Sequence, residues 1–271
     1  MSTNKTVTQK LTLSAMLIGI ATVLSCIKLL DLPYGGSITA GSMVPIVLIG
    51  YLFGNAWGVL SALCYSVIQL LLGMNALSYA TSAGAAIAII LLDYVFAFTL
   101  IGLSGTFKKL SKNAAVSLPL AALIACLLRY VCHVISGCTV WAGLSIPSGQ
   151  ALLYSLAYNA TYMLPETLVT VIAAAYLART LSFENGTIRR VATTNQKGSL
   201  LTAIANGVLA LGVIADIVLL SAHIQNPESG EFDFSGLAEM NFVPLICVTV
   251  AAVVVFAAMH LVAKNQAKTN G

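Results

Sequence analysis

The feature that most constrains this chain is a succession of apolar runs, most of them long enough to cross a lipid bilayer. A bilayer core about 30 Å thick needs roughly 20 apolar residues at about 1.5 Å rise per residue. Only 8% of the residues are charged, against about a quarter in a soluble globular protein. The sequence therefore predicts an all-α integral membrane protein and excludes an ordinary water-soluble enzyme. The runs lie at 11–30, 40–54, 56–72, 83–104, 114–138, 151–178, 200–221 and 242–262.

The second and third runs are shorter than the others and are joined by a turn at Gly54-Asn55. They are either two tilted helices or parts of one re-entrant unit. A polar stretch at 181–199 is the one clear internal boundary. We therefore expect a six-helix membrane domain over 1–180, a cytoplasmic linker over 181–199 and a two-helix extension over 200–271.

The basic residues predict the orientation of the spans. Lys and Arg near span ends accumulate on the cytoplasmic side. With eight spans, both termini share one side with the loops near 105–113 and 179–199, and these segments hold eleven of the 13 basic residues. The opposite side receives Lys28, at the outer end of the first helix, and several acids. We therefore expect both termini to be cytoplasmic. The acids are Asp31, Glu228, Glu231, Asp233 and Glu239.

Several other functions are disfavoured by what the sequence lacks. The basic residues are too dispersed for a nucleic-acid-binding face, despite a net charge of +4. The six cysteines form no CxxC pair and no Cys/His spacing typical of a metal site, so we expect neither a metal nor a cofactor. The chain has no GxxxxGK[ST] loop, so it is not expected to hydrolyse ATP itself.

Ionisable residues inside the apolar runs point to a binding site. Each costs at least about 2.5–3.5 kcal/mol near the bilayer centre and therefore needs a partner. The six-helix domain contains Asp93, Arg129, His133 and Glu166. Arg129, His133 and Gly137 recur every four residues and share one helix face, where the glycine leaves room for close approach. A purely structural Asp93–Arg129 salt bridge is the alternative reading.

A second polar face lies on the sixth run. Tyr154, Tyr158, Tyr162 and Glu166 repeat every four residues, with Asn159 beside them. Tyr162 is expected to bond within the protein, whereas Tyr154 and Asn159, nearer the outer end, are predicted ligand contacts.

Trp141 follows the fifth run and is either a ligand contact or an interfacial belt residue. Together an acid, an imidazole, an amide and aromatic rings favour an organic cation, because a desolvated cation on an aromatic face gains about 2 kcal/mol or more.

Four strings carry a resemblance to a known family, in the right order on the right helices. They are GGSITAGSMVP at 35–45, LLDY at 91–94, LLRYVCHVISG at 127–137 and YSLAYNATYMLPE at 154–166. Over about residues 8–180 the chain resembles the thiamine-specific substrate-binding subunits (S components) of bacterial energy-coupling factor transporters, the ThiT family. The resemblance implies a six-helix S-component bundle in the bacterial cell membrane. It also implies thiamine as ligand, and a transmembrane T subunit and two ATPases as partners.

By position, the resemblance assigns ligand contacts to Asp93, Tyr94, His133, Gly137, Trp141, Tyr154 and Asn159. Arg129 is expected to hold Asp93 ionised and oriented, and Tyr158 to support the site. Tyr65 and Tyr79 are weaker candidates for the pocket or its lid, because the chain departs from its relatives around them. Asp93 is also one methylene shorter than the Glu of some relatives.

Small residues on the first helix suggest where a partner docks. Ala15 and Gly19 form a small-xxx-small pair that permits close helix approach. They lie where S components share an Ala-rich motif for the T subunit. The last two helices fall outside the resemblance.

Three rival functions remain at this point. The ligand is alternatively a thiamine precursor or another aromatic vitamin. A free-standing ion-coupled carrier would relay protons through Asp93, Glu166 or Asp216, although inverted repeats are not evident. An intramembrane enzyme would use His133 with Asp93, but no nucleophile at a suitable spacing and no HExxH motif supports it.

Overall fold

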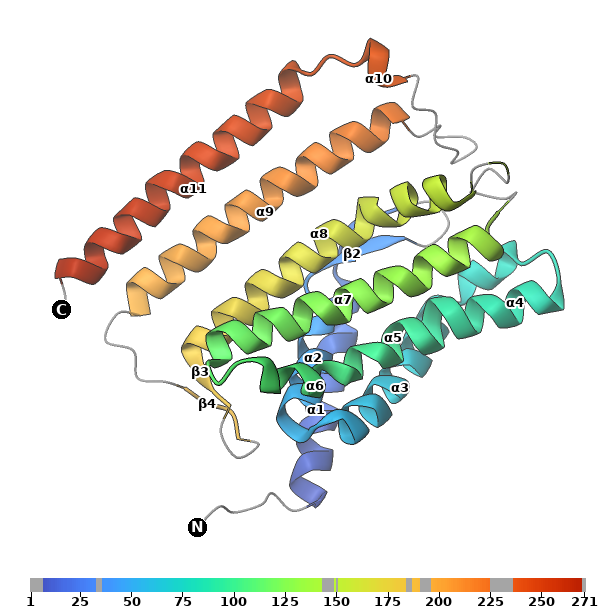
Figure 1. The fold of residues 1–271 in the computed structure, drawn as a ribbon, viewed down its shortest axis with the longest axis horizontal. Coiled ribbons are helices and arrows are strands. Elements are labelled where there is room, and N and C mark those ends of the chain that lie inside the picture. Colours follow the sequence, from blue (N-terminus) through green and yellow to red (C-terminus); the bar gives the residue numbers. More distant parts are fainter. Residues whose placement is uncertain are drawn as a thin grey trace.

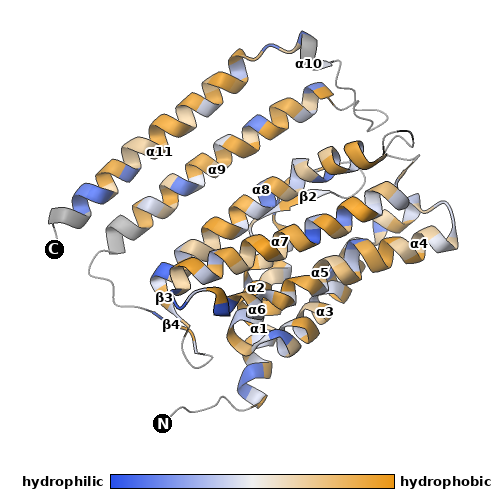
Figure 2. Cartoon of the chain, in the orientation of Figure 1, coloured by the Kyte–Doolittle hydropathy of each residue, from blue (hydrophilic) through white to orange (hydrophobic). Residues whose placement is uncertain are grey.

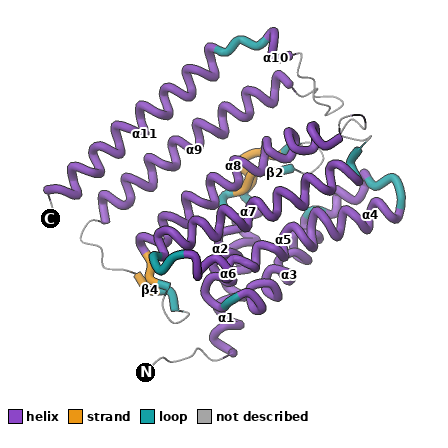
Figure 3. The backbone as a smooth tube through the Cα atoms, in the orientation of Figure 1, coloured by secondary structure: helices purple, strands orange, loops and turns teal. Residues whose placement is uncertain are grey.

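Seven helices are long and apolar enough to cross a membrane in the described part of the chain. The structure is a computed structural model that describes residues 7–32, 36–142, 149, 151–183, 187–190, 196–224 and 236–269. Figure 1 shows the helices side by side, and Figure 3 shows how little of the chain is strand. The predicted all-α membrane fold is confirmed.

The six-helix body consists of α1 to α8, where the segment Ala83–Leu110 acts as one span. Its long helices are α1 (Val7–Cys26), α3 (Asn55–Leu72), α7 (Ala114–Thr139) and α8 (Ala151–Thr180), with the shorter α2 at Met43–Phe53.

The span Ala83–Leu110 is built from α4 (Ala83–Ile89), a π-helical turn η3 (Ile90–Phe96), α5 (Ala97–Thr99), η4 (Leu100–Leu103), α6 (Ser104–Phe107) and η5 (Lys108–Leu110). A short 3-10 helix, η2 (Met74–Tyr79), precedes it.

The first apolar run does not continue as a helix to residue 30, as the sequence suggested. Helix α1 ends at Cys26, and β1 (Lys28–Asp31) pairs antiparallel with β2 (Ser37–Thr39). Lys28 therefore lies in a hairpin rather than at a helix end. An apolar strand such as Leu29-Leu30 cannot be distinguished from a helix end by hydrophobicity alone.

Helix α2 is short because the chain turns sharply at Gly54, where φ is +86°, a region that favours glycine. Its 11 residues extend only about 16 Å, half a bilayer core. The run at 40–54 is therefore a half-length helix that begins inside the body next to the β1–β2 hairpin.

Three glycines allow α2, α3 and η4 to pack backbone against backbone. A Cβ added at Gly58 would overlap the carbonyl of Gly102 and the Cα of Gly50, and one added at Gly102 would overlap the backbone of Gly58. Ser104 reinforces this contact by donating a hydrogen bond to the Val47 carbonyl at 2.8 Å.

The C-terminal extension is a pair of long helices, α9 (Gln196–Ile224) and α11 (Val243–Thr269), with the short α10 (Gly236–Glu239) between them. Helix α9 packs against α8, and α11 packs against α9. Both are coloured hydrophobic along most of their length in Figure 2. Asp216 accepts a hydrogen bond from the Thr249 hydroxyl at 2.6 Å and so links the two helices.

Part of the segment 181–199, which was expected to be a linker, is folded and packed. Its beginning forms β3 (Leu181–Ser182) and β4 (Arg189–Arg190), an antiparallel pair, while Phe183 is buried in the main core. Residues 184–186 and 191–195 lie outside the described residues, as do Glu228, Glu231 and Asp233. The six-helix body thus extends past residue 180.

We predict that Gly102→Ala destabilises the protein by about 1–3 kcal/mol, since overpacking forces the backbones apart. Thermal unfolding of the detergent-purified protein measures this effect. Gly207→Ala is the matched control, because no atom lies within 4 Å of a Cβ added there. Equal unfolding temperatures for the two variants would contradict the tight contact.

Candidate functional site

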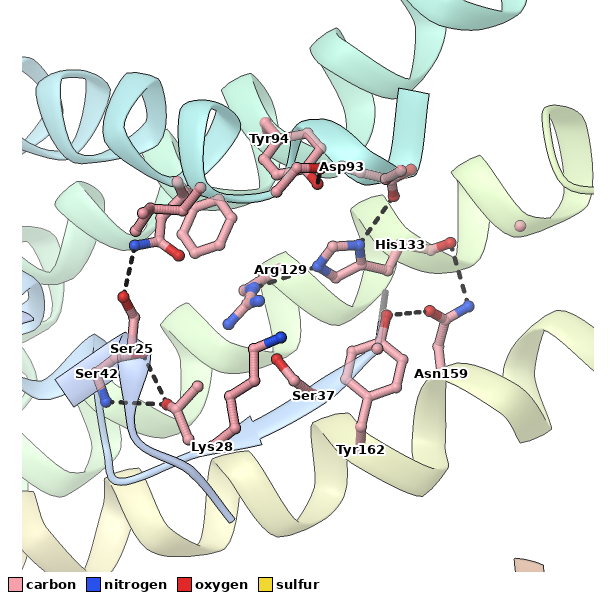
Figure 4. A pocket seen from close by; sticks show the side chains of 18 of the residues that line it. Ser25, Lys28, Ser37, Ser42, Asp93, Tyr94, Arg129, His133, Asn159 and Tyr162 are labelled. Atoms are coloured by element: carbon pink, nitrogen blue, oxygen red, sulfur yellow. Dashed lines mark hydrogen bonds and ion pairs between the residues drawn. The ribbon is translucent and has the colours of Figure 1, made fainter. Parts of the chain in front are cut away.

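A cavity of about 380 Å³ lies within the six-helix body. It occupies the half of the body in which α1, α3 and α7 end and α2 and α8 begin. Its size falls within the range of small-molecule sites. Figure 4 shows charged, hydroxyl and aromatic side chains facing it from several elements. Among the residues that line it are Lys28, Asp93, Tyr94, Arg129, His133 and Trp141.

Asp93 reaches the cavity from the π-helical turn η3. A π-helical turn inserts an extra residue into a helix and often marks a functional site. Asp93 and the adjacent Tyr94, both within this turn, line the cavity. Tyr94 is fixed by donating a hydrogen bond to the Gly73 carbonyl at 2.8 Å.

The Asp93 carboxylate is held by three groups from α7 and the residues after it. Oδ1 lies 2.9 Å from His133 Nδ1, while Oδ2 accepts hydrogen bonds from the Ser136 hydroxyl at 2.7 Å and the Trp141 indole nitrogen at 3.1 Å. Hydrogen bonds to the ionised form stabilise it. The site thus carries a preoriented carboxylate directly beside an indole ring.

Arg129 does not form a salt bridge with Asp93, which was the alternative reading of these two charges. Within the described chain, its Nε donates to His133 Nε2 at 3.2 Å, so the imidazole lies between the two charges. Because His133 Nε2 accepts, Nδ1 carries the proton that is donated to Asp93. The guanidinium carbon also lies 4.3 Å from the centre of the Phe98 ring. Arg129 therefore orients Asp93 only through His133.

Asn159 lines the cavity but its amide also joins α7 to α8. Its Nδ2 donates to the His133 carbonyl at 3.2 Å and the Ser155 carbonyl at 2.9 Å, and its Oδ1 accepts from the Tyr162 hydroxyl. The internal bond predicted for Tyr162 is therefore present. A Cβ at Gly137 would overlap the Ser155 side chain, so this glycine permits the α7–α8 contact.

The structure brings together most of the predicted site residues, but not all. Asp93, Tyr94, His133, Gly137, Trp141, Tyr158 and Asn159 line the cavity, and so does Arg129.

Tyr154, Tyr65 and Tyr79 are not among the lining residues. Tyr154 packs against the apolar cluster that contains Ile38 and Tyr158. Tyr65 is fully buried and meets Phe98 edge to face at 5.5 Å. Tyr79 is exposed, and its ring centre lies 6.0 Å from that of Trp141.

The cavity also has a wall that the sequence reading missed. It comes from the end of α1, the β1–β2 hairpin, the start of α2 and the end of α3. Lys28 was interpreted only as a topological charge, and Ser37, Thr39 and Ser42 were noted only as part of the string GGSITAGSMVP. The polar members of this wall are Ser25, Lys28, Ser37, Thr39, Ser42 and Gln69.

In the described part of the chain, no group of three or more His, Cys, Asp or Glu side chains is placed to hold a metal ion. Charged and aromatic side chains are distributed unevenly around the cavity. A carboxylate and aromatic rings lie at one side, and Figure 4 shows the Lys28 and Arg129 side chains pointing into the other.

Comparison with known proteins matches the six-helix body. The profile of a family described as thiamine transporter protein (Thia_YuaJ) matches residues 11–184. The thiamine transporter ThiT of Bacillus subtilis (strain 168) is 36% identical over 161 residues, which cover 56% of this chain and 79% of that protein. The solved structure of ThiT from Listeria monocytogenes aligns with a TM-score of 0.52 and 26% identity, covering 63% of this chain and 93% of that one.

We predict that Cys26, which is exposed and lines the cavity, reacts with a water-soluble thiol reagent. Cys126 is fully buried and is the matched control. In variants that keep only one of these cysteines, Cys26 should be labelled at least about tenfold faster, because the reagent needs access to the thiolate. Equal labelling rates in folded protein would show that the cavity is not open to solvent.

Proposed function

The chain belongs to the thiamine transporter protein family, and we propose that it captures thiamine in the cavity beside Asp93. It is a transport protein of the membrane and not an enzyme. The observation that carries the binding site is the Asp93 carboxylate, fixed by three donors and adjacent to the Trp141 ring. This arrangement suits the permanently cationic thiazolium ring of thiamine.

The carboxylate and the indole stabilise the cation in different ways. Asp93 supplies the opposite charge that a desolvated cation needs. Trp141 is 8% exposed and offers an aromatic face of the kind that attracts cations. Because the indole nitrogen is bonded to Asp93, the ring and the carboxylate are held in one geometry. The His133 ring, held between Asp93 and Arg129, packs against the bound ligand.

The neutral heterocycle and the hydroxyl of thiamine have partners elsewhere in the cavity. The aminopyrimidine edge needs donors and acceptors. Both Nδ2 hydrogens of Asn159 are used within the protein, but its Oδ1 retains one acceptor lone pair, and the nearby tyrosine hydroxyls supply the other contacts. Tyr158 takes this role more directly than Tyr154, because only Tyr158 lines the cavity. The hydroxyethyl group fits the wall of hydroxyl side chains to which Ser37 and Ser42 contribute.

The energy for uptake comes from other subunits. We propose that the chain is the S component of an energy-coupling factor transporter and associates with a T subunit and two ATPases. In support, Ala15 and Gly19 lie on an exposed face of α1, and no atom is within 4 Å of a Cβ added at Gly19. A partner helix can therefore approach α1 closely there.

The distribution of Lys and Arg supports an orientation with both termini in the cytoplasm. The cavity then opens toward the outside, as capture of an external vitamin requires. An ion-coupled carrier is less well supported, because Asp216 is bonded to Thr249 in the C-terminal pair and lies away from the cavity.

We expect the purified chain alone to bind thiamine with one-to-one stoichiometry, measured by isothermal titration calorimetry. Trp141→Ala should weaken binding by about 2 kcal/mol, or about thirtyfold, through loss of a desolvated cation–π contact. Trp57→Ala is the matched control, because Trp57 donates to Ser14 outside the cavity. Unchanged affinity in Trp141→Ala would assign the indole to the membrane interface. Tighter binding of a thiamine precursor or of riboflavin would change the assigned ligand.

Gly19→Leu should abolish thiamine uptake by cells while leaving thiamine binding by the purified protein intact, since the side chain would block an approaching helix. Its control is Ile20→Leu, at an exposed position that is already large. Full uptake with Gly19→Leu would place the docking surface elsewhere.

A further inference from the structure

Glu166 is a buried acid that has no role in ligand capture as described above. It lies on α8, is 1% exposed, and does not line the cavity. A carboxylate buried in a membrane-spanning helix is costly and is expected to serve a function.

Both carboxylate oxygens of Glu166 bind a single residue of the β1–β2 hairpin. Oε2 accepts the Thr39 backbone N–H at 2.5 Å, and Oε1 accepts the Thr39 hydroxyl at 2.6 Å. Thr39 and Glu166 are 127 residues apart in the sequence. The side chain therefore joins the connection between α1 and α2 directly to α8.

Two of the groups that hold the Glu166 carboxyl belong to Thr39, and the Ser42 side chain next to the start of α2 is a third. Among the described residues, it forms no ion pair with Lys, Arg or His. Removing a partner from a buried polar group costs its full desolvation penalty, and more for a charged group. Displacing the hairpin from α8 would leave the carboxylate without the two Thr39 donors, so the contact resists opening.

The residue that Glu166 holds forms part of the cavity wall. Thr39 lines the cavity together with Gly36 and Ser37, the residues just before it on the hairpin. Ile38, between them, is fully buried against Tyr158, Tyr162 and the rest of their cluster. Strand β2 is thus fixed to α8 by an apolar contact at Ile38 and a polar one at Thr39.

We propose that Glu166 is a positioning residue that latches the β1–β2 hairpin against α8 and thereby slows the escape of bound ligand. It acts through Thr39 without touching the ligand. Opening of this wall requires both Glu166–Thr39 hydrogen bonds to break. The inference rests on the proposed function for the identity of the ligand, but the latch itself is a property of the ligand-free protein.

The latch is tested first without ligand, by hydrogen–deuterium exchange of the peptide that contains Thr39. Glu166→Gln retains the shape but removes an acceptor, so exchange in this peptide should rise about tenfold. Thr170→Val is the matched control, because it removes a buried hydroxyl one turn away that donates to the Glu166 backbone carbonyl and not to its carboxylate. Exchange unchanged in Glu166→Gln relative to the wild type would overturn the latch.

The effect on capture is tested by isotope dilution, which measures the dissociation rate of labelled thiamine. Glu166→Gln and Thr39→Val should each raise this rate about tenfold, and the double variant should dissociate no faster than either single one. Additive effects, or rates within twofold of the wild type, would overturn the proposal. Failure of the wild type to bind thiamine would instead refute the proposed ligand, while the exchange experiment would still decide the latch.

Discussion

The hydrogen bonds around the Asp93 carboxylate are the interaction on which the site depends. They connect the fourth span of the body to α7 and to Trp141. A carboxylate at this depth is stable only with several donors. The same bonds that make the charge tolerable also fix its position. Binding a cation then requires little rearrangement, which favours affinity.

Two irregular segments make this arrangement possible. The π-helical turn at Ile90–Phe96 directs Asp93 and Tyr94 into the cavity, and the half-length α2 leaves space that the β1–β2 hairpin fills. Non-helical backbone inside a membrane protein is tolerated where it is buried in protein or lines a cavity. The irregular segments therefore lie where the backbone borders the cavity.

The sequence predicts one side of the cavity well and the other side poorly. Arg129, His133 and Gly137 are spaced four residues apart on α7, and they share one face in the structure because a regular helix places such residues on one side. The hydrogen bond from Arg129 to His133 on its own helix was not anticipated, since spacing on α7 does not determine which of its residues faces Asp93 on the fourth span. The wall containing Lys28 and Thr39 was missed because a short hairpin in an apolar run leaves no helical period to detect.

The C-terminal pair is separate in sequence but not in packing. The family match ends at residue 184, before α9 begins, and none of the described residues of α9 or α11 lines the cavity. Yet Ile214 and Ile224 of α9 pack against the same apolar cluster as Tyr154. That cluster contains Ile38 and Tyr158, which flank the cavity wall. The extension therefore packs against α8 and against the apolar cluster beside the cavity, so it supports the site without lining it in the described residues.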